Sequence, residues 1–483
     1  MKTAADPLLA PGAAPGAAPD VAGRRVTVVG GARSGLAAAR LLARRGARVF
    51  LTDAAPAPEG LAEALGQAGV AYEFGGHSAR ALDADLVVLS PGVPSTAPLV
   101  QQALRQHLPV VSEIEAAAWF CRGPIVAVTG SNGKTTTTSL IGHLFRTAAR
   151  PHVVAGNIGY PFSDYVDDVD ARTAVVLEVS SFQLDHVDAF RPRVAVLLNI
   201  TPDHLDRYGY DFNRYAQAKF RIFARQTPDD WLVYNHDDAL VRDYVAGYAA
   251  RHGLTPIGFS AETPLARGAF ARGGQLVLAL PEAAPGRAPH PSDPVTREEI
   301  LMPTSDLALR GRHNLYNSLA AAVVGRAMEI QSDVVRESLT SFEGVPHRLE
   351  HVRTVGGVAF VNDSKATNVN AVWYALESFP GRLVLIAGGR DKGNDYAPLR
   401  RLVEEKVVGL VGLGESGDKV LAELGPHAGQ TARAHSMEEA IQFARLMAEP
   451  GDTVLLSPAC ASFDLFQNYE DRGDTFKRLV MAL

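Results

Sequence analysis

Residues 125–136 read IVAVTGSNGKTT, an apolar run followed by a glycine-rich loop, a lysine and two threonines, and a helical pattern continues over residues 137–144. Glycines let backbone N–H groups curl around phosphate oxygens, and the N-terminus of the following helix adds positive potential. The lysine can reach the terminal phosphates and the first threonine can ligate Mg²⁺. The sequence therefore predicts an ATP-binding loop made of Gly130, Ser131, Asn132, Gly133, Lys134, Thr135 and Thr136.

The loop is shorter than the common phosphate-loop pattern. Two residues separate Gly130 from Gly133, where the common pattern has four. The alternative is a structural turn that carries an exposed lysine. The strand, loop, Lys-Thr pair and helix nevertheless follow one another in the order that phosphate binding requires, and this order favours the nucleotide site.

Short β-branched runs alternate with helical stretches in three blocks on both sides of this loop, which is typical of parallel sheets built from βαβ units. We predict an α/β fold of three domains: a Rossmann-like N-terminal domain, a central ATPase-like domain with a mostly parallel sheet, and a Rossmann-like C-terminal domain. The segment 261–297 is rich in Pro, Gly, Ala and Arg and predicts a peripheral excursion with a hairpin near 276–280, away from catalysis. The expected boundaries are a disordered tail at 1–20 and domains at 21–113, 114–344 and 345–483.

The composition favours a small-molecule enzyme of the reduced cytosol. A formal net charge of −6 over 483 residues leaves no excess of positive charge that would bind a nucleic-acid backbone or an anionic membrane surface. The two cysteines, Cys121 and Cys460, lack the spacing of a metal site or a redox pair. The first twenty residues lack the basic and apolar regions of a signal peptide. We expect a cytoplasmic monomer without membrane insertion.

Two polar residues follow strands of the central block. Glu178 comes directly after the apolar run Val175 to Leu177, and His204 lies in the segment NITPDHLD at 199–206, which follows another apolar run. A carboxylate and an imidazole at strand ends beside a phosphate loop can hold divalent cations. Either residue alone is more often an ordinary polar loop residue.

Two other classes of protein compete with an ATP-dependent enzyme. The opening VTVVGGARSG at 26–35, with Asp53 after the second strand, is also how a dinucleotide-dependent oxidoreductase begins, but Ala32 stands where the fingerprint has its second glycine. A nucleotide-switch module is the other alternative. A third block that carries Lys392 and Ser462 argues against a switch.

Several segments together resemble the Mur ligase family, whose members carry a TG-S/T-N-GKT loop, a glutamate on the next strand and an N-I-x-x-DH-L-D segment. Within the family, three segments resemble the motifs of members that add D-glutamate: EVSSFQL at 178–184, NDSKATN at 362–368 and SPACASFD at 457–464. The L-alanine-adding branch has a histidine before Gly133 and a Tyr-Ala-His segment, which are absent here. The later branches and folylpolyglutamate synthase lack this Rossmann-like opening.

The resemblance implies an ATP-dependent ligase of cytoplasmic peptidoglycan precursor synthesis that joins D-glutamate to UDP-N-acetylmuramoyl-L-alanine through an acyl phosphate. It implies two Mg²⁺ ions, the first bound by Thr135 and Glu178, and the second by His204 and a carbamylated Lys219. Spacing alone indicates for Lys219 a solvated position on an amphipathic helix over 212–220. The expected catalytic residues are Lys134, His204 and Lys219.

The resemblance also assigns the binding residues. The expected UDP-sugar residues are Arg33, Ser34, Asp53, Ala54, Ser90, Gly92, Asn157 and His204. The expected adenine-side residues are Asn314, Asn317, Arg348 and Asp363. The expected residues for the amino acid are Thr367, Lys392, Ser462 and Tyr469. The sequence departs from the family at Tyr469, where phenylalanine is usual, and in the residues that flank Lys392, which leaves the glutamate site less defined than the ATP site.

Overall fold

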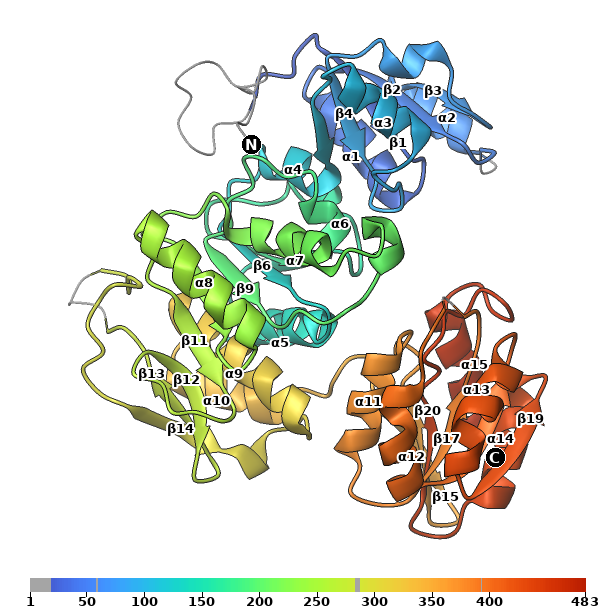
Figure 1. The fold of residues 1–483 in the computed structure, drawn as a ribbon. Coiled ribbons are helices and arrows are strands. Elements are labelled where there is room, and N and C mark those ends of the chain that lie inside the picture. The colour runs from blue at the N-terminus through green and yellow to red at the C-terminus, as the bar shows by residue number, and fades with distance from the viewer. Residues whose placement is uncertain (1–18, 58–59, 283–286, 392) are drawn as a thin grey trace. The chain divides into compact units, whose positions relative to one another are not determined.

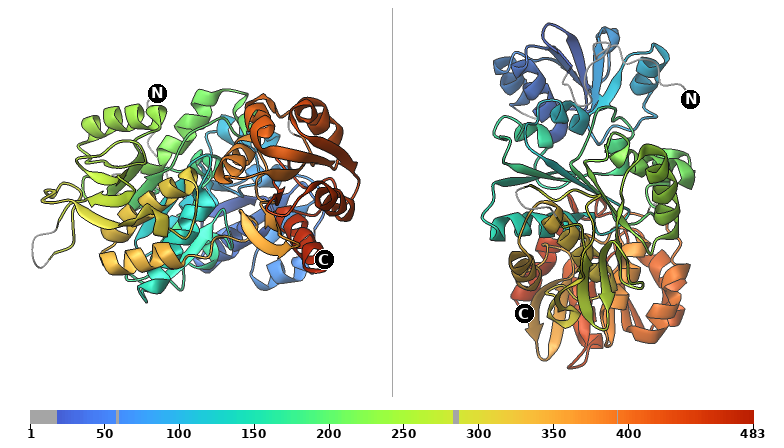
Figure 2. Two further views of the ribbon diagram at one scale, coloured as in Figure 1. Left: turned by 90° about the horizontal axis from the view of Figure 1, so that it is seen from below. Right: turned by 90° about the vertical axis from the view of Figure 1, so that its left-hand side faces the viewer.

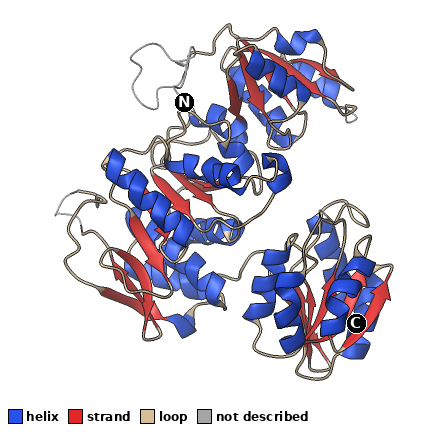
Figure 3. Cartoon of the chain, in the orientation of Figure 1, coloured by secondary structure: helices blue, strands red, loops and turns tan. Residues whose placement is uncertain are grey.

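The computed structural model describes residues 19–57, 60–282, 287–391 and 393–483 (Figure 1). Two compact units result: the first runs to Leu307 and includes Tyr316–Ser341, and the second combines Ala308–Leu315 with Phe342–Leu483. Three largely parallel sheets, two in the first unit and one in the second, confirm the predicted α/β fold class (Figure 3). The predicted domain boundaries stay predictions, and residues 1–18 of the expected tail lie outside the described residues.

The first sheet is parallel throughout, in the order β3-β2-β1-β4-β5. Because β1 pairs with β2 on one side and β4 on the other, the chain changes direction across the sheet after β3, and the turn after β1 lies at that switch point. The elements are β1 (Arg25–Val29), α1 (Arg33–Arg44), β2 (Arg48–Asp53), α2 (Leu61–Gln67), β3 (Ala71–Phe74), β4 (Leu86–Leu89), α3 (Pro98–Arg105), β5 (Val110–Ser112) and α4 (Glu113–Ala118).

The second sheet has the order β14-β13-β12-β11-β10-β9-β6-β8-β7, and its strands from β6 to β12 pair in parallel. Strands β6 and β8 are buried along their whole length, and helices cover both faces of this sheet (Figure 2). The parallel strands are β6 (Ile125–Thr129), β7 (His152–Gly156), β8 (Ala174–Glu178), β9 (Val194–Leu197), β10 (Trp231–Asn235), β11 (Ile257–Ser260) and β12 (Gly268–Arg272).

The segment predicted as a peripheral excursion extends the edge of this sheet. The expected hairpin forms between β12 and β13 (Gln275–Ala279), and β14 (Glu299–Pro303) adds a further antiparallel strand. Because β12 pairs with β11, the hairpin belongs to the central sheet itself. The helices of this part are α5 (Lys134–Thr147), α6 (Ser181–Leu184), α7 (Phe212–Phe220), α8 (Ala239–His252), α9 (Arg312–Ala327) and α10 (Ser332–Ser341).

The sheet of the second unit has the order β15-β16-β20-β17-β18-β19, with only the β15–β16 pair antiparallel. Its elements are β15 (Glu350–Val355), β16 (Val358–Asn362), α11 (Val369–Ser378), β17 (Leu383–Ala387), α12 (Arg400–Lys406), β18 (Val407–Leu413), α13 (Gly417–Leu424), β19 (Gln430–Ala434), α14 (Met437–Met447), β20 (Thr453–Leu456) and α15 (Tyr469–Met481). Among the described residues, no helix is both long and apolar enough to cross a bilayer.

Candidate active site

The glycine-rich loop joins β6 to α5 as the sequence predicts, and the bend depends on Gly133. This residue is the N-cap of α5 with φ 83°, a left-handed conformation that favours glycine. A Cβ atom there would lie 2.5 Å from Oδ1 of Asn317. The same Oδ1 atom accepts a hydrogen bond from the Thr137 hydroxyl at 3.1 Å. Asn317 therefore packs against the start of α5, where the predicted nucleotide site lies.

The loop is held in place by the segment that follows β9. The Ser131 hydroxyl donates to the Thr201 carbonyl at 2.8 Å, accepts from the Thr201 N–H at 2.9 Å and lies 2.8 Å from the Tyr215 hydroxyl. The Asn132 N–H donates to the side chain of Asn199, whose amide returns a bond to the Asn132 carbonyl. Asn199, Thr201 and Tyr215 were not predicted as site residues, although two of them belong to the quoted NITPDHLD segment.

Two lysines meet at the carbonyl of Gly130. Lys134 Nζ lies 2.8 Å from this oxygen and 2.9 Å from the Ser131 carbonyl, and Lys219 Nζ lies 2.8 Å from the Gly130 oxygen. Lys219 is 1 % exposed, so the solvated position indicated by spacing is wrong. Lys219 and Tyr215 lie one turn apart on the buried face of α7, and this face of the helix packs against the loop.

Burial is the main reason that the pKa of the Lys219 amine lies well below its usual range, and the charge of Lys134 lowers it further. Three carboxylates pull this pKa in the opposite direction, and they belong to Asp203, Glu178 and Asp185. The Lys219 amine is therefore easier to deprotonate than a surface lysine.

Glu178 ends β8 beside the loop, because its register partner on β6 is Val128. It is 2 % exposed, and its Oε1 atom accepts a hydrogen bond from the Asn157 amide at 2.9 Å. In the part of the chain that the structure describes, the buried Oε2 atom has no hydrogen-bond partner. An ionised carboxylate oxygen left without a donor is costly unless a cation accompanies it.

The oxygens near the loop are of the type that Mg²⁺ prefers. Thr135, predicted to share the ion with Glu178, is nearly buried in the first turn of α5. The described residues contain no group of three or more His, Cys, Asp or Glu side chains able to hold a metal. Beside nucleotides, Mg²⁺ is usually held by one or two protein oxygens together with phosphate oxygens and water.

His204 has a left-handed backbone, with φ 50°, and a side chain that is 42 % exposed. Its ring lies edge-on to that of Phe182, and Nε2 is 3.8 Å from a carboxylate oxygen of Asp203. The imidazole is thus on the surface of this segment, while Lys219 is buried. No residue count or spacing in the sequence indicated this difference.

The turn after β1 is built by two of the predicted UDP-sugar residues. Asp53 accepts hydrogen bonds from the backbone N–H groups of Gly31 and Ala55, and the buried Ser90 hydroxyl donates to the Gly30 carbonyl. Arg33, Ser34 and Ala54 lie around this turn at least partly exposed. The carbonyl of Gly92 accepts a bond from Arg207, which was not predicted. Asp53 and Ser90 therefore hold the turn in shape.

In the second unit, the adenine-side prediction is centred on Asp363. Its carboxylate accepts hydrogen bonds from the Ser457 hydroxyl at 2.8 Å and from the Leu349 N–H at 3.2 Å. Burial raises the pKa of Asp363 to about 6, although the charge of Arg348 opposes the rise. Asn314 also belongs to this unit, and its amide donates to the Arg310 carbonyl.

Three of the four residues predicted for the amino acid lie after β16 and β20 of the second unit. Ser462 is buried, Thr367 and Tyr469 are half-buried, and the Tyr469 carbonyl accepts a bond from the Ser364 hydroxyl at 2.8 Å. The Lys365 ammonium lies 5.0 Å from the centre of the Tyr469 ring. Lys392 lies outside the described residues.

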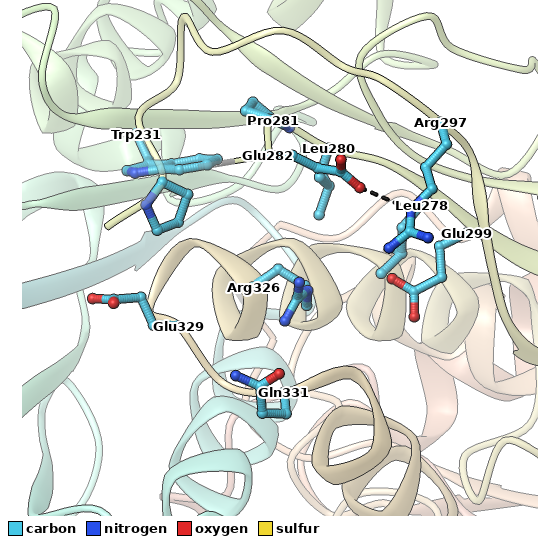
Figure 4. A pocket seen from close by; sticks show the side chains of 11 residues that line it. Trp231, Leu278, Leu280, Pro281, Glu282, Arg297, Glu299, Arg326, Glu329 and Gln331 are labelled. Atoms are coloured by element: carbon cyan, nitrogen blue, oxygen red, sulfur yellow. Dashed lines mark hydrogen bonds and ion pairs between the residues drawn. The ribbon is translucent and has the colours of Figure 1, made fainter. Parts of the chain in front are cut away.

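A pocket of about 370 Å³ lies elsewhere in the first unit, between the edge strands and α9 (Figure 4). Its lining includes Trp231, Leu278 and Arg326, and an ion pair between Arg297 and Glu282 closes one side at 2.9 Å. None of the predicted site residues lines it.

The fold and the loop define a phosphate-loop nucleotide-binding protein of the parallel α/β class. Three family models match successive parts of the chain: the MurD-like N-terminal domain at residues 24–112, the Mur ligase middle domain at 128–325 and the Mur ligase glutamate ligase domain at 347–460. The chain belongs to the Mur ligase family, as its motifs indicated.

Curated relatives match the chain over nearly its full length. The UDP-N-acetylmuramoylalanine–D-glutamate ligase of Salinibacter ruber is 60% identical over 464 residues, which is 95% of this chain and 98% of that protein. The protein of the same name from Chloroherpeton thalassium is 45% identical, over 96% of this chain and 99% of its own.

Solved structures share the fold. The UDP-N-acetylmuramate-alanine ligase of Thermotoga maritima superposes with a TM-score of 0.57 at 19% identity, over 95% of this chain and 99% of its own. The MurF ligase of the same organism, solved in complex with ADP, gives a TM-score of 0.55 at 18% identity, over 96% of each chain.

Proposed function

We propose that this chain is an ATP-dependent ligase that joins D-glutamate to UDP-N-acetylmuramoyl-L-alanine in cytoplasmic peptidoglycan precursor synthesis. The names of the curated relatives support the two substrates. The observation that carries the chemistry is local: two lysines meet at one loop carbonyl beside a buried glutamate oxygen that has no hydrogen-bond partner among the described residues. This arrangement suits a site that receives a triphosphate and a cation.

The reaction begins with a carboxylate, which is a poor acyl donor because its leaving group would be oxide. In the proposed reaction a carboxylate oxygen of the alanyl residue attacks the γ-phosphorus of ATP, the bond to the bridging oxygen breaks, and ADP leaves. The amine of D-glutamate then attacks the acyl carbon. The C–O bond to phosphate breaks, inorganic phosphate leaves, and the nitrogen loses a proton to give the amide.

The site must stabilise negative charge in both steps. Lys134 supplies a cation at the loop, and the backbone N–H groups at the start of α5 supply further donors. Thr135 and Glu178 fit a Mg²⁺ ion, which when bound neutralises phosphate charge. The predicted second ion is assigned to His204 and a carbamylated Lys219.

Burial lowers the pKa of the Lys219 amine, and this shift is in the direction that carbamylation needs. A neutral amine can attack CO₂ through its lone pair, so that an N–C bond forms, one C–O π pair moves to oxygen, and the nitrogen loses a proton. The lowered pKa favours this neutral form. The carbamate offers oxygen atoms where an ammonium would repel a metal ion.

The remaining predicted residues divide by substrate. The turn after β1 and Asn157 are assigned to the UDP-sugar, Asn314, Asn317, Arg348 and Asp363 to the adenosine side of ATP, and Thr367, Lys392, Ser462 and Tyr469 to D-glutamate. We also propose the domain boundaries and the monomeric state expected from the sequence.

A phosphate-release assay tests the function. Turnover of ATP should require both UDP-N-acetylmuramoyl-L-alanine and D-glutamate, and L-glutamate should not replace the D isomer. A nucleotide-switch protein would instead hydrolyse ATP at a rate independent of the two acceptors. Mass spectrometry of the product should show one added glutamyl residue, and its absence would contradict the proposal.

A further inference from the structure

The second unit contains a buried polar cluster that the assigned roles leave unexplained. Its centre is the thiol of Cys460, which is 1 % exposed. The sulfur lies 3.1 Å from the Tyr396 hydroxyl, 3.3 Å from the Ser416 hydroxyl and 3.5 Å from the Asn394 amide. We call these four residues the Cys460 cluster.

The members of the Cys460 cluster come from three different strand ends. Asn394 and Tyr396 follow β17, Ser416 follows β18, and Cys460 follows β20. These strands are neighbours and parallel, so their carboxyl ends meet at one edge of the sheet, where ligands of open α/β sheets collect. The cluster therefore lies directly beneath the loops at that edge.

The contacts of the cluster fix the backbone of these loops. Ser416 Oγ accepts the Gly389 N–H at 3.1 Å, and the Asn394 amide donates to the Ala459 carbonyl at 3.0 Å. The Arg390 N–H donates to the Ala461 carbonyl at 2.8 Å. These bonds connect the loop after β17 to the loop after β20. The last of them is made at Ala461, the residue before Ser462.

Gly389 shows how closely the two loops approach. Its φ is 142°, and a Cβ atom there would lie 2.3 Å from the Ala461 carbonyl oxygen and 3.1 Å from Cβ of Cys460. Only glycine fits between the loops at this point. Separation of the loops by a fraction of an ångström would require the cluster contacts to lengthen.

The contacts at the Cys460 sulfur come from neutral groups, while two charged side chains bind backbone carbonyls of the cluster: Lys419 donates to Asn394 and Arg472 to Cys460. Burial raises the pKa of the Cys460 thiol, so the sulfur stays protonated and neutral near pH 7. Burial likewise raises the pKa of the Tyr396 hydroxyl. Neutral hydrogen bonds are directional and individually weak, so the cluster contributes geometry more than affinity.

We propose that the Cys460 cluster positions the loops after β17 and β20 for the amino-acid substrate, with Tyr396 and Cys460 as positioning residues. This inference rests on the proposed function, because the amino acid assigned to these loops is D-glutamate. It adds residues that touch the loops and not the substrate. The expected signature is a change in KM for D-glutamate without a matching change in KM for ATP.

The variants Tyr396→Phe, Cys460→Ala and Cys460→Ser test the proposal. From the loss of one or several hydrogen bonds, we expect KM for D-glutamate to rise about five-fold in Tyr396→Phe and about ten-fold or more in Cys460→Ala. Cys460→Ser retains a donor and an acceptor and should recover most of the loss. KM for ATP should stay within about two-fold. Tyr396→Phe removes a single oxygen and serves where the Cys460 variants fold poorly.

Matched controls exist in the first unit. Cys121→Ala removes the other cysteine, whose thiol donates to the Gly123 carbonyl, and Tyr248→Phe removes a hydroxyl that donates to the Ala224 carbonyl. Both should leave the two KM values unchanged. An unchanged KM for D-glutamate in Tyr396→Phe and Cys460→Ala, or a parallel rise in KM for ATP, would overturn the positioning role.

A hydrogen-exchange measurement distinguishes a failure of this proposal from a failure of the proposed function. Peptides that cover 388–391 and 459–462 should exchange faster in Cys460→Ala than in the parent protein without any substrate present, and unchanged exchange would overturn the cluster's role. A parent protein that never consumes D-glutamate would instead overturn the proposed function, and the amino-acid assignment of these loops with it.

Discussion

The phosphate loop of the first unit and the Cys460 cluster of the second are both built at the carboxyl ends of parallel strands, yet different forces hold them. The loop gathers buried or half-buried ionisable groups: Lys134, Lys219 and Glu178. The cluster gathers neutral hydroxyl, thiol and amide groups. A site for a triphosphate needs charge that is fixed in advance, whereas loops that recognise a small zwitterion need fixed distances.

The largest effect should follow the loss of the loop cation. Lys134→Ala should reduce ligation about a thousand-fold or more, because the triphosphate loses its fixed positive charge as the phosphoryl group transfers. Affinity for the UDP-sugar, measured by calorimetry, should stay nearly intact. Lys406→Ala is a matched control, since that ammonium also donates to backbone carbonyls but lies at the end of α12. Loss of UDP-sugar binding in a folded Lys134→Ala protein would contradict the assignment.

The second prediction distinguishes the roles of the two lysines that meet at the Gly130 carbonyl. Lys219→Ala should lose activity about a hundred-fold without unfolding, because the proposed carbamate oxygens disappear. High concentrations of formate or acetate should restore part of the activity by filling the vacated oxygen positions. The matched control is Lys134→Ala, which neither anion should rescue. Full activity in unrescued Lys219→Ala would leave the buried lysine with a structural role only.

Glu178 is the acidic residue at the phosphate loop, and its substitution tests whether it is a metal ligand. Glu178→Gln preserves shape and the oxygen that accepts from Asn157, but it replaces with an amide the oxygen for which the described part of the chain offers no hydrogen-bond partner. Activity should fall about ten- to a hundred-fold, and the Mg²⁺ concentration for half-maximal rate should rise. A lower rate with an unchanged Mg²⁺ dependence would count against a metal ligand at this position.

How much was predictable depends on how locally each feature is encoded. The loop from Gly130 to Thr136 is one continuous stretch, and Glu178 follows a strand whose apolar run is plain in the sequence, so both were predicted. The burial of Lys219 depends on how α7 packs against a loop 89 residues earlier, and periodicity alone gave the wrong exposure. The hydrogen bonds of Asn199 and Tyr215 to the phosphate loop, and those of the Cys460 cluster, depend on contacts between several loops. No single segment of the sequence encodes them.

The last effect is on stability and not on activity, and it concerns Asp363, which is buried like the ionisable groups of the first unit but belongs to the second. Its pKa is raised from 3.8 to about 6, mainly by burial, so the folded unit holds this proton more tightly than the unfolded chain does. The resulting stability is fully present below the unfolded pKa and is lost as pH rises to the folded pKa, which amounts to about 3 kcal/mol between pH 4 and pH 6. Asp363→Asn does not titrate, its amide oxygen can still accept from the Leu349 N–H, and the Ser457 hydroxyl can turn to accept from the new amide. Thermal unfolding at pH 4, 5, 6 and 7 should therefore show a steeper loss of stability in the parent protein than in Asp363→Asn. Equal slopes in the two proteins would mean that the buried Asp363 carboxyl is ionised throughout, and that the second unit stabilises charge as the phosphate loop does.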